Sequence, residues 1–270
     1  MNKPQEILDL EKYLDHKLYL LINDENDYNS AIFYKNLYSY NVNEKNEVIQ
    51  LNLMNSYLDD ISFIEKFEKL THLNLGANKI IDIESLLFLE NLQFLDLSTN
   101  KIEDIGVLNH LKKIKNLYID NNNIEYLPLL ELPELEELWL YSNQISKISN
   151  LKNLKNLISL NISNNQIVDI TVLKELEKIE ILDLSKNKIN NISALSKFKK
   201  LVDLRLNENE ISDITSLKNI KISRELFLGQ NLIMDLSPLY NSLKINEINF
   251  FNIFENPLLK YPPLEIAFSP

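Results

Sequence analysis

The sequence predicts an α/β solenoid, a right-handed superhelix with a parallel β-sheet on its concave face and short 3₁₀ or irregular segments on its convex face. The segment Leu70-x-x-Leu73-x-Leu75-x-x-Asn78-x-Ile80 recurs almost unchanged along the chain. Ten repeats start at residues 48, 70, 92, 114, 135, 157, 179, 201, 223 and about 248. Leu and Asn occupy 51 and 38 of the 270 positions. A constant period of about 20–29 residues indicates units that bury their apolar sides by stacking.

The residue type at each position of the repeat has a chemical reason. The first Leu of the repeat is counted as position 1. Positions 4 and 6 are aliphatic and alternate with polar residues, as a short half-buried strand requires. Positions 11, 14, 17 and 20 are aliphatic every third residue, a spacing that favours a 3₁₀ turn over a long helix. Position 9 turns the chain, and an amide there has both a donor and an acceptor for backbone groups left unpaired by the turn.

Position 9 is Asn in nine of the ten repeats, and Ser56 is the exception in the first. A hydroxyl has less reach than an amide, which fits a terminal repeat with one neighbour of its own kind. The predicted Asn ladder is Asn78, Asn100, Asn122, Asn143, Asn165, Asn187, Asn209, Asn231 and Asn256.

Two domains follow from the repeat boundaries: residues 1–47 as an N-terminal cap and residues 48–270 as the solenoid with a proline-rich end. The apolar spacing predicts an amphipathic helix over about residues 4–22, ended by the polar stretch 23–30. Residues 38–53 are expected to form strand, turn and strand. A stack exposes its apolar interior at its end, so this helix and hairpin are expected to cover the first repeat.

The pattern L-x-x-L-x-L-x-x-N-x-I-x-D-I-x-x-L-x-x-L resembles the 22-residue subclass of leucine-rich repeats. That subclass includes the internalins and the leucine-rich regulatory subunit of protein phosphatase 1. The end of the chain, Asn256-Pro257-Leu258 followed by Pro262-Pro263-Leu264-Glu265-Ile266, resembles the close of repeat arrays in Roco-type proteins. The resemblance implies the solenoid fold and a binding role, without naming a ligand.

The concave face is where a partner is expected, because positions 3, 5, 7 and 8 point outward from the strands. Large aromatic side chains there are unusual, since their exposure to water is unfavourable unless they meet one another or a ligand. A first cluster surrounds the single Trp of the chain, and a second, around Arg205 and Phe227, continues to Phe250 and Phe254. The predicted partner-binding residues are Phe94, Asp96, Tyr118, Asp120, Glu137, Trp139, Tyr141, Asp183, Arg205 and Phe227. The alternative is that the rings form a structural ladder that binds nothing.

Composition argues against most other activities. The sequence has no Cys and its three histidines are far apart, so no catalytic residue, cofactor or metal site is predicted. An Asp precedes position 14 in six repeats, and it is interpreted as a turn cap in preference to a calcium ligand. A net charge of −11 opposes binding to nucleic acid. With no signal peptide or long apolar segment, a cytoplasmic chain with no membrane span is expected.

The predicted function is therefore a non-enzymatic protein–protein interaction module that binds a partner protein on its concave face. One alternative is a sensor or scaffold segment of a longer signalling enzyme, such as a Roco-type GTPase, cut at Pro270. A second is a purely structural, self-associating repeat protein. The sequence leaves the oligomeric state and the partner's identity open.

Overall fold

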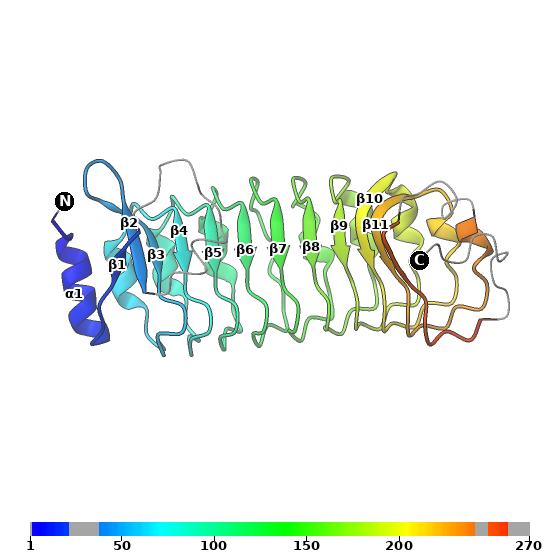
Figure 1. The fold of residues 1–270 in the computed structure, drawn as a ribbon, viewed down its shortest axis with the longest axis horizontal. Coiled ribbons are helices and arrows are strands. Elements are labelled where there is room, and N and C mark those ends of the chain that lie inside the picture. Colours follow the sequence, from blue (N-terminus) through cyan, green and yellow to red (C-terminus); the bar gives the residue numbers. More distant parts are fainter. Residues whose placement is uncertain (1, 22–37, 241–247, 259–270) are drawn as a thin grey trace. The chain divides into compact units, whose positions relative to one another are not determined.

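The computed structural model describes residues 2–21, 38–240 and 248–258. The chain divides into two compact units: unit 1 comprises Met1–Ile124 and Glu131–Leu135, and unit 2 comprises Glu125–Leu130 and Glu136–Pro270. Figure 1 labels their helices and strands, coloured along the sequence. The helices and strands of unit 1 are α1 (Gln5–Leu14), β1 (Tyr19–Leu20), β2 (Ser39–Val42), β3 (Val48–Asn52), η1 (Ser62–Lys66), β4 (His72–Asn74), η2 (Glu84–Phe88), β5 (Phe94–Asp96), η3 (Gly106–His110) and β6 (Asn116–Tyr118). Those of unit 2 are β7 (Glu137–Trp139), η4 (Ser149–Leu151), β8 (Ser159–Asn161), η5 (Thr171–Glu175), β9 (Ile181–Asp183), η6 (Ser193–Lys197), β10 (Lys200–Arg205), η7 (Thr215–Leu217), β11 (Lys221–Phe227), η8 (Ser237–Leu239) and β12 (Phe250–Asn252).

The strands of each unit lie side by side in chain order. In unit 1, β1 pairs with β2 in parallel, β2 with β3 antiparallel, and β3 to β6 in parallel. In unit 2, β7 to β12 are all parallel. The position-4 leucines are register partners from strand to strand, for example Leu160 with Leu182 and Leu182 with Leu204, and all three are fully buried. The predicted parallel-sheet solenoid is confirmed.

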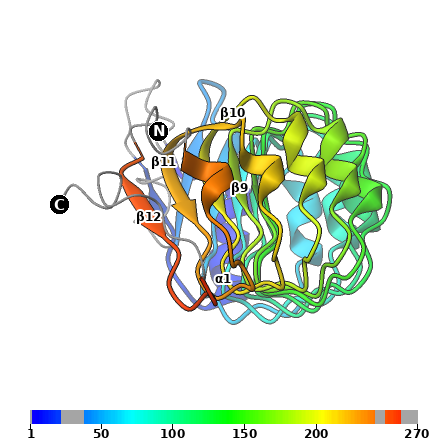
Figure 2. The same ribbon diagram turned by 90° about the vertical axis from the view of Figure 1, so that its right-hand side faces the viewer.

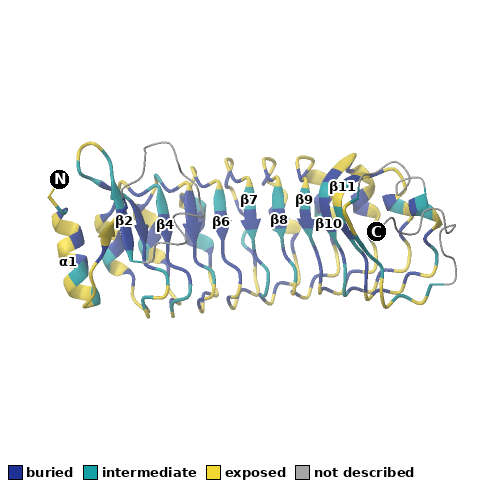
Figure 3. Cartoon of the chain, viewed as in Figure 1, coloured by how far each residue is buried: buried dark blue, intermediate teal, exposed yellow. Residues whose placement is uncertain are grey.

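Aliphatic side chains at every third position of the returning segment build the convex side. In the second repeat, the Leu86 N–H donates to the Ile83 carbonyl and the Leu89 N–H to the Leu86 carbonyl, both at 3.0 Å. These bonds between residues three apart define the 3₁₀ helix, so the three-residue spacing points every aliphatic side chain inward. Figure 2 shows β11 toward the left of the view and the short helices of unit 2 farther to the right. The burial colouring of Figure 3 marks strands β3 to β6 as mainly buried, and strands β7 to β9 as a mixture of buried and intermediate residues.

Position 8 of every repeat adopts the left-handed backbone conformation, although none of these residues is Gly. Their φ angles lie between 52° and 59°. This conformation reverses the chain after each strand and costs a residue with a Cβ about 1–2 kcal/mol. Asn tolerates it best, and three of the ten positions carry Asn; the set is Asn55, Ala77, Thr99, Asn121, Ser142, Asn164, Lys186, Glu208, Gln230 and Glu255.

The N-terminal helix is shorter than the sequence pattern predicts. Helix α1 ends at Leu14, and Asp15 takes a left-handed conformation with its N–H bonded to the Glu11 carbonyl. The Glu11 carboxylate then accepts the Leu18 N–H at 2.7 Å and pairs with Lys3 at 2.6 Å, which directs the chain into β1. Leu18 is buried all the same, so the apolar spacing continued past the helix end. The polar stretch 23–30 lies outside the described residues.

The ninth repeat departs from the others inside its strand. Ile222, which is 1 % exposed, pairs with Leu201, whereas the repeat count had assigned Ser223 to that position. Between Leu201 and Asp203 the register with β11 shifts, because β11 holds one extra residue there. This β-bulge turns Arg224 toward β10. The ninth repeat, from 223 to about 248, is longer than the others, and part of it, residues 241–247, lies outside the described residues.

Candidate binding surface

Within each unit, the Asn ladder joins a repeat to the one before it. The Asn165 Nδ2 atom donates to the Leu140 carbonyl of the preceding repeat at 3.0 Å and to the Ile162 carbonyl of its own repeat at 3.2 Å. Its Oδ1 atom accepts the Ile145 N–H at 2.9 Å. Two of the four partners of Asn165 lie in the preceding repeat, and the first repeat has no preceding repeat for an amide to reach. The Oγ atom of Ser56 at that position is buried without a hydrogen-bond partner.

The column of Asp residues before position 14 caps the 3₁₀ helices. All six carboxylates accept the backbone N–H two residues later at 2.8 Å, as Asp60 does from Ser62. Among the described residues, no group of three His, Asp or Glu side chains is arranged to hold a metal ion. The capping function explains these carboxylates without a calcium ion.

A second Asx motif sits at position 5, on the concave face. In six repeats the position-5 side chain accepts the N–H of position 7 at 2.8–3.1 Å, and these residues are Asn52, Asn74, Asp96, Asn161, Asp183 and Asn252. Tyr118, Trp139, Arg205 and Phe227 occupy position 5 in the other four. These four side chains do not carry the carboxylate or amide oxygen that accepts the position-7 N–H in the other six repeats.

In unit 1 the predicted binding residues are buried. Phe94 and Tyr118 are 5 % and 9 % exposed, and their rings meet edge to face with centroids 5.4 Å apart. Phe94 also stacks on His72 at 5.8 Å. The carboxylates Asp96 and Asp120 are both 3 % exposed. This half of the first cluster therefore forms a ring ladder of the kind that stabilises a sheet.

Burial also lowers the pKa of His72 to about 4, because the charged imidazolium loses hydration. Above pH 6.5 the side chain is neutral in both folded and unfolded chains, and its contribution to stability is complete. Between pH 6.5 and 4 only the unfolded chain takes up the proton, so the unfolding free energy should fall by up to about 1.4 kcal/mol per pH unit. His72→Gln places there the residue that β3 carries at the equivalent position, Gln50. Urea unfolding of both proteins across this range should show a shallower decline for the variant, and parallel curves would refute the assignment.

In unit 2 the aromatic side chains are more accessible. Trp139 and Tyr141 are half-buried and their ring centroids lie 6.3 Å apart, both on the concave face at β7. Glu137 precedes them on the same strand and is also half-buried. The two rings form a surface that a partner can contact.

A charge network crosses β9, β10 and β11 of unit 2. Arg205 pairs with Glu225 at 2.5 Å and with Asp183 at 3.6 Å, and its guanidinium lies 5.7 Å from the Phe227 ring centroid. Arg224, placed by the bulge, pairs with the buried Asp203. Sequence reasoning singled out neither Arg224 nor Glu225. The one signal was Ser223 at a position that is otherwise aliphatic, next to the aliphatic Ile222.

The C-terminal end of the same face carries exposed phenylalanines. Phe250 is 58 % exposed and Phe254 71 % exposed, so most of each side chain faces solvent. Phe227 is half-buried on the adjacent strand, with Asn252 of β12 as its register partner.

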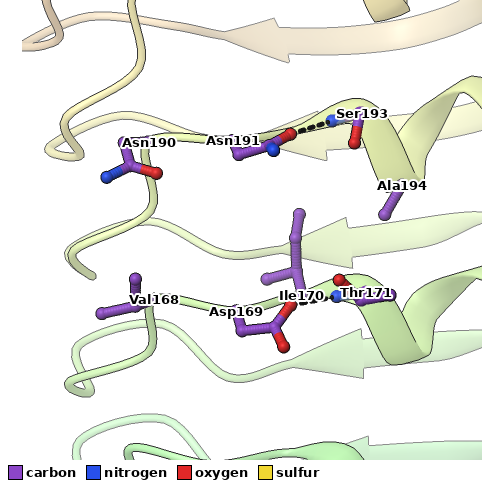
Figure 4. Close-up of a pocket in the computed structure, with 8 residues that line it drawn as sticks. All are labelled: Val168, Asp169, Ile170, Thr171, Asn190, Asn191, Ser193 and Ala194. Atoms are coloured by element: carbon purple, nitrogen blue, oxygen red, sulfur yellow. Dashed lines mark hydrogen bonds between the residues drawn. The ribbon is translucent and has the colours of Figure 1, made fainter.

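One shallow pocket of about 160 Å³ lies on the turns of unit 2 (Figure 4). Two of its polar side chains are engaged in turns, because Asp169 accepts the Thr171 N–H at 2.8 Å and Asn191 the Ser193 N–H at 2.9 Å. These are the capping bonds of two successive repeats. The pocket is therefore a gap between neighbouring turns.

Comparison with protein families supports the repeat assignment directly. Residues 133–175 match the family model described as Leucine Rich repeats (2 copies). The chain is built of leucine-rich repeats. No curated protein matches its sequence.

Solved structures agree with this assignment. The leucine-rich repeat protein is similar to an internalin, inlF, of Listeria monocytogenes, with 26 % identity, a TM-score of 0.64, and coverage of 78 % of this chain and 77 % of that one. It is similar to a leucine-rich repeat protein of Leptospira interrogans at 26 % identity and a TM-score of 0.70, covering 82 % of this chain and 64 % of that protein. The Arabidopsis receptor kinase HAESA ectodomain, solved with an IDA peptide hormone ligand, has 22 % identity, a TM-score of 0.69, and coverage of 80 % and 44 %. At that identity the likeness is one of fold.

No helix in the described part of the leucine-rich repeat protein is long and apolar enough to cross a membrane.

Proposed function

We propose that this leucine-rich repeat protein is a non-enzymatic interaction module that binds a partner protein on the concave face of unit 2. The observation that carries the proposal is the set of position-5 residues that replace Asx. Trp139 and Phe227 stand where Asn161 and Asp183 of the same unit carry the side-chain oxygen that accepts the position-7 N–H. A surface ring in place of a turn-stabilising Asx residue is better explained by a contact outside the chain, and Arg205, held by Glu225 and Asp183, lies over the Phe227 ring.

The exposure of the aromatic side chains supports unit 2, and not unit 1, as the binding surface. Trp139 and Phe227 are half-buried and Phe250 is exposed, whereas Phe94 and Tyr118 are buried. Trp, Tyr and Arg are the residues that contribute most to protein interfaces, because they bury a large area with little loss of side-chain entropy. The concave residues of unit 1 are then supports of the fold, and Trp139, Tyr141, Arg205 and Phe227 are the proposed contacts.

The test uses a substitution that the fold itself provides. Trp139→Asn installs the residue that β8 carries at the same position, so it should keep or raise the melting temperature by completing an Asx turn. Affinity for a partner captured from the source lysate and then purified should fall by about 30-fold, or 2 kcal/mol. Calorimetric titration and circular dichroism measure the two effects.

Phe88→Asn is the matched control, because Phe88 is 49 % exposed on the convex helix η2. It should leave the affinity unchanged. A Trp139→Asn protein that melts earlier and binds normally would show that Trp139 is a structural residue. The cytoplasmic location expected from the sequence stays a prediction, which fractionation of the source cells checks.

A further inference from the structure

A row of lysines follows one edge of unit 2, where each convex segment returns to the next strand. In repeats 5 to 8, positions 18–22 hold nine Lys against two acidic residues, Glu175 and Glu177. We call this surface the basic edge. Its lysines, all exposed, are Lys152, Lys155, Lys174, Lys178, Lys197, Lys199, Lys200, Lys218 and Lys221.

The basic edge is local to these repeats. Positions 18–22 of repeats 1 to 4 hold four Lys and five acidic residues, so the same turns need no excess of lysine to fold. The chain as a whole carries −11, and the basic edge alone carries nine positive charges against two negative. Charge is therefore segregated along the stack, whereas a merely solvated surface mixes both signs.

The structure places several of these cations close together. Lys200 and Lys221 are register partners on the adjacent strands β10 and β11, and like charges at directly opposed strand positions are unfavourable. Within the basic edge, Lys155 pairs with Glu175 at 3.0 Å, and Lys178 donates to the Asn156 amide at 2.6 Å. Two lysines that repel each other at the centre of the edge are expected in an anion-binding site without its ligand, because the bound anion would neutralise them.

We propose that the basic edge binds an acidic protein segment, rich in Asp and Glu. This surface is separate from the concave face, and the inference goes beyond the function proposed above. Charge complementarity favours an anionic ligand, and the charges of unit 2 around the edge limit its length. Outside the basic edge, unit 2 holds 15 acidic and 7 basic side chains, so long polyanions such as nucleic acid and extended anionic membranes meet repulsion there. A short acidic segment meets the lysines alone.

The experiment measures fluorescence anisotropy of labelled synthetic peptides with the full chain. The probes are a peptide of alternating Glu and Ser, about twelve residues long, and the same peptide with Lys in place of Glu. A single-stranded RNA of similar length and phosphatidylserine vesicles are further arms. Titrations at about 50 mM and about 300 mM NaCl show how much of the affinity comes from electrostatic attraction, because salt screens exposed charges.

Two triple variants test whether the Glu peptide binds at the basic edge. Lys199→Gln with Lys200→Gln and Lys221→Gln removes the centre of the basic edge, whereas Lys112→Gln with Lys113→Gln and Lys115→Gln removes three lysines from unit 1. The Glu peptide should bind the wild-type protein, lose at least about tenfold in affinity with the first variant and at 300 mM NaCl, and be unaffected by the second. Circular dichroism should show both variants folded, and the first no less stable, because a like-charge contact is relieved.

Several results would overturn the inference. They are absence of Glu-peptide binding at 50 mM NaCl, equal losses in the two variants, and tighter binding of the Lys peptide, the RNA or the vesicles. None of them touches the concave-face proposal, which the Trp139→Asn measurement tests by itself.

Discussion

Removal of residues 1–47 should cause the largest loss of stability of any change considered for this protein. Strand β2 pairs along the whole of β3, with Tyr40 opposite Leu51, and covers an edge that would otherwise expose unpaired backbone groups. Ile7 and Tyr40 are 0 % and 2 % exposed. Residues 48–270 alone should therefore aggregate, or melt about 10–20 °C lower if they stay monomeric, as a loss of roughly 5 kcal/mol gives for a domain of this size. Light scattering and a thermal melt measure both.

Neighbouring residues of helix α1 supply the control for this cap. Ile7→Asp introduces a charge into the buried side of the helix and should destabilise strongly. Leu8→Asp makes the same change at a residue that is 38 % exposed and should cost little. If residues 48–270 stayed monomeric with an unchanged melting temperature, residues 1–47 would be an appendage and not a cap.

Most of the fold could be predicted from the sequence because each repeat position is chemically distinct. The alternation of Leu73 and Leu75 fixed the strand, and the spacing of Ile83, Leu86 and Leu89 fixed the 3₁₀ helix. With a constant period, one repeat determines its neighbours, so errors do not accumulate along the stack.

The predictions that the structure changed depend on single side-chain contacts. Helix α1 ends early because Glu11 binds the Leu18 N–H, a bond seven residues apart that apolar spacing does not reveal. The bulge in β11 comes from Ile222 taking a buried position one residue early. The end of helix α1 and the bulge in β11 each depend on one or two residues, and a pattern taken over many repeats does not reveal them.

The candidate site was the least predictable part. Position alone put Phe94 and Trp139 on the same face, and nothing in the sequence separates a ring that packs on His72 from one that stays half-buried. Burial depends on which neighbours a side chain has across strands, and that requires coordinates. The Asx pattern at position 5 is readable from the sequence and marks Tyr118, Trp139, Arg205 and Phe227, but only the coordinates separate the buried Tyr118 from the other three.

The second large effect is expected at the Asn ladder, because one side chain there serves two repeats. The Asn165 amide is 9 % exposed and makes three donor contacts to carbonyl groups and one acceptor contact to the Ile145 N–H. An Ala at this position leaves a buried N–H and several carbonyl groups without partners, and water has little access to replace them. The cost of each unpaired group is about 1–3 kcal/mol, so the interface between the fifth and sixth repeats should weaken as a whole.

Asn165→Ala should lower the unfolding free energy by about 3 kcal/mol, measured by urea unfolding followed through circular dichroism and through the fluorescence of Trp139, the single Trp of the chain. Ser56→Ala changes the equivalent position of the first repeat, where the hydroxyl has no hydrogen-bond partner, and should change the free energy by less than about 0.5 kcal/mol. The contrast is decisive because both variants delete one polar group from the same place in the repeat. Equal losses would mean that the ladder fills space without bonding, and the stacking of these repeats would then depend on the aliphatic rows alone.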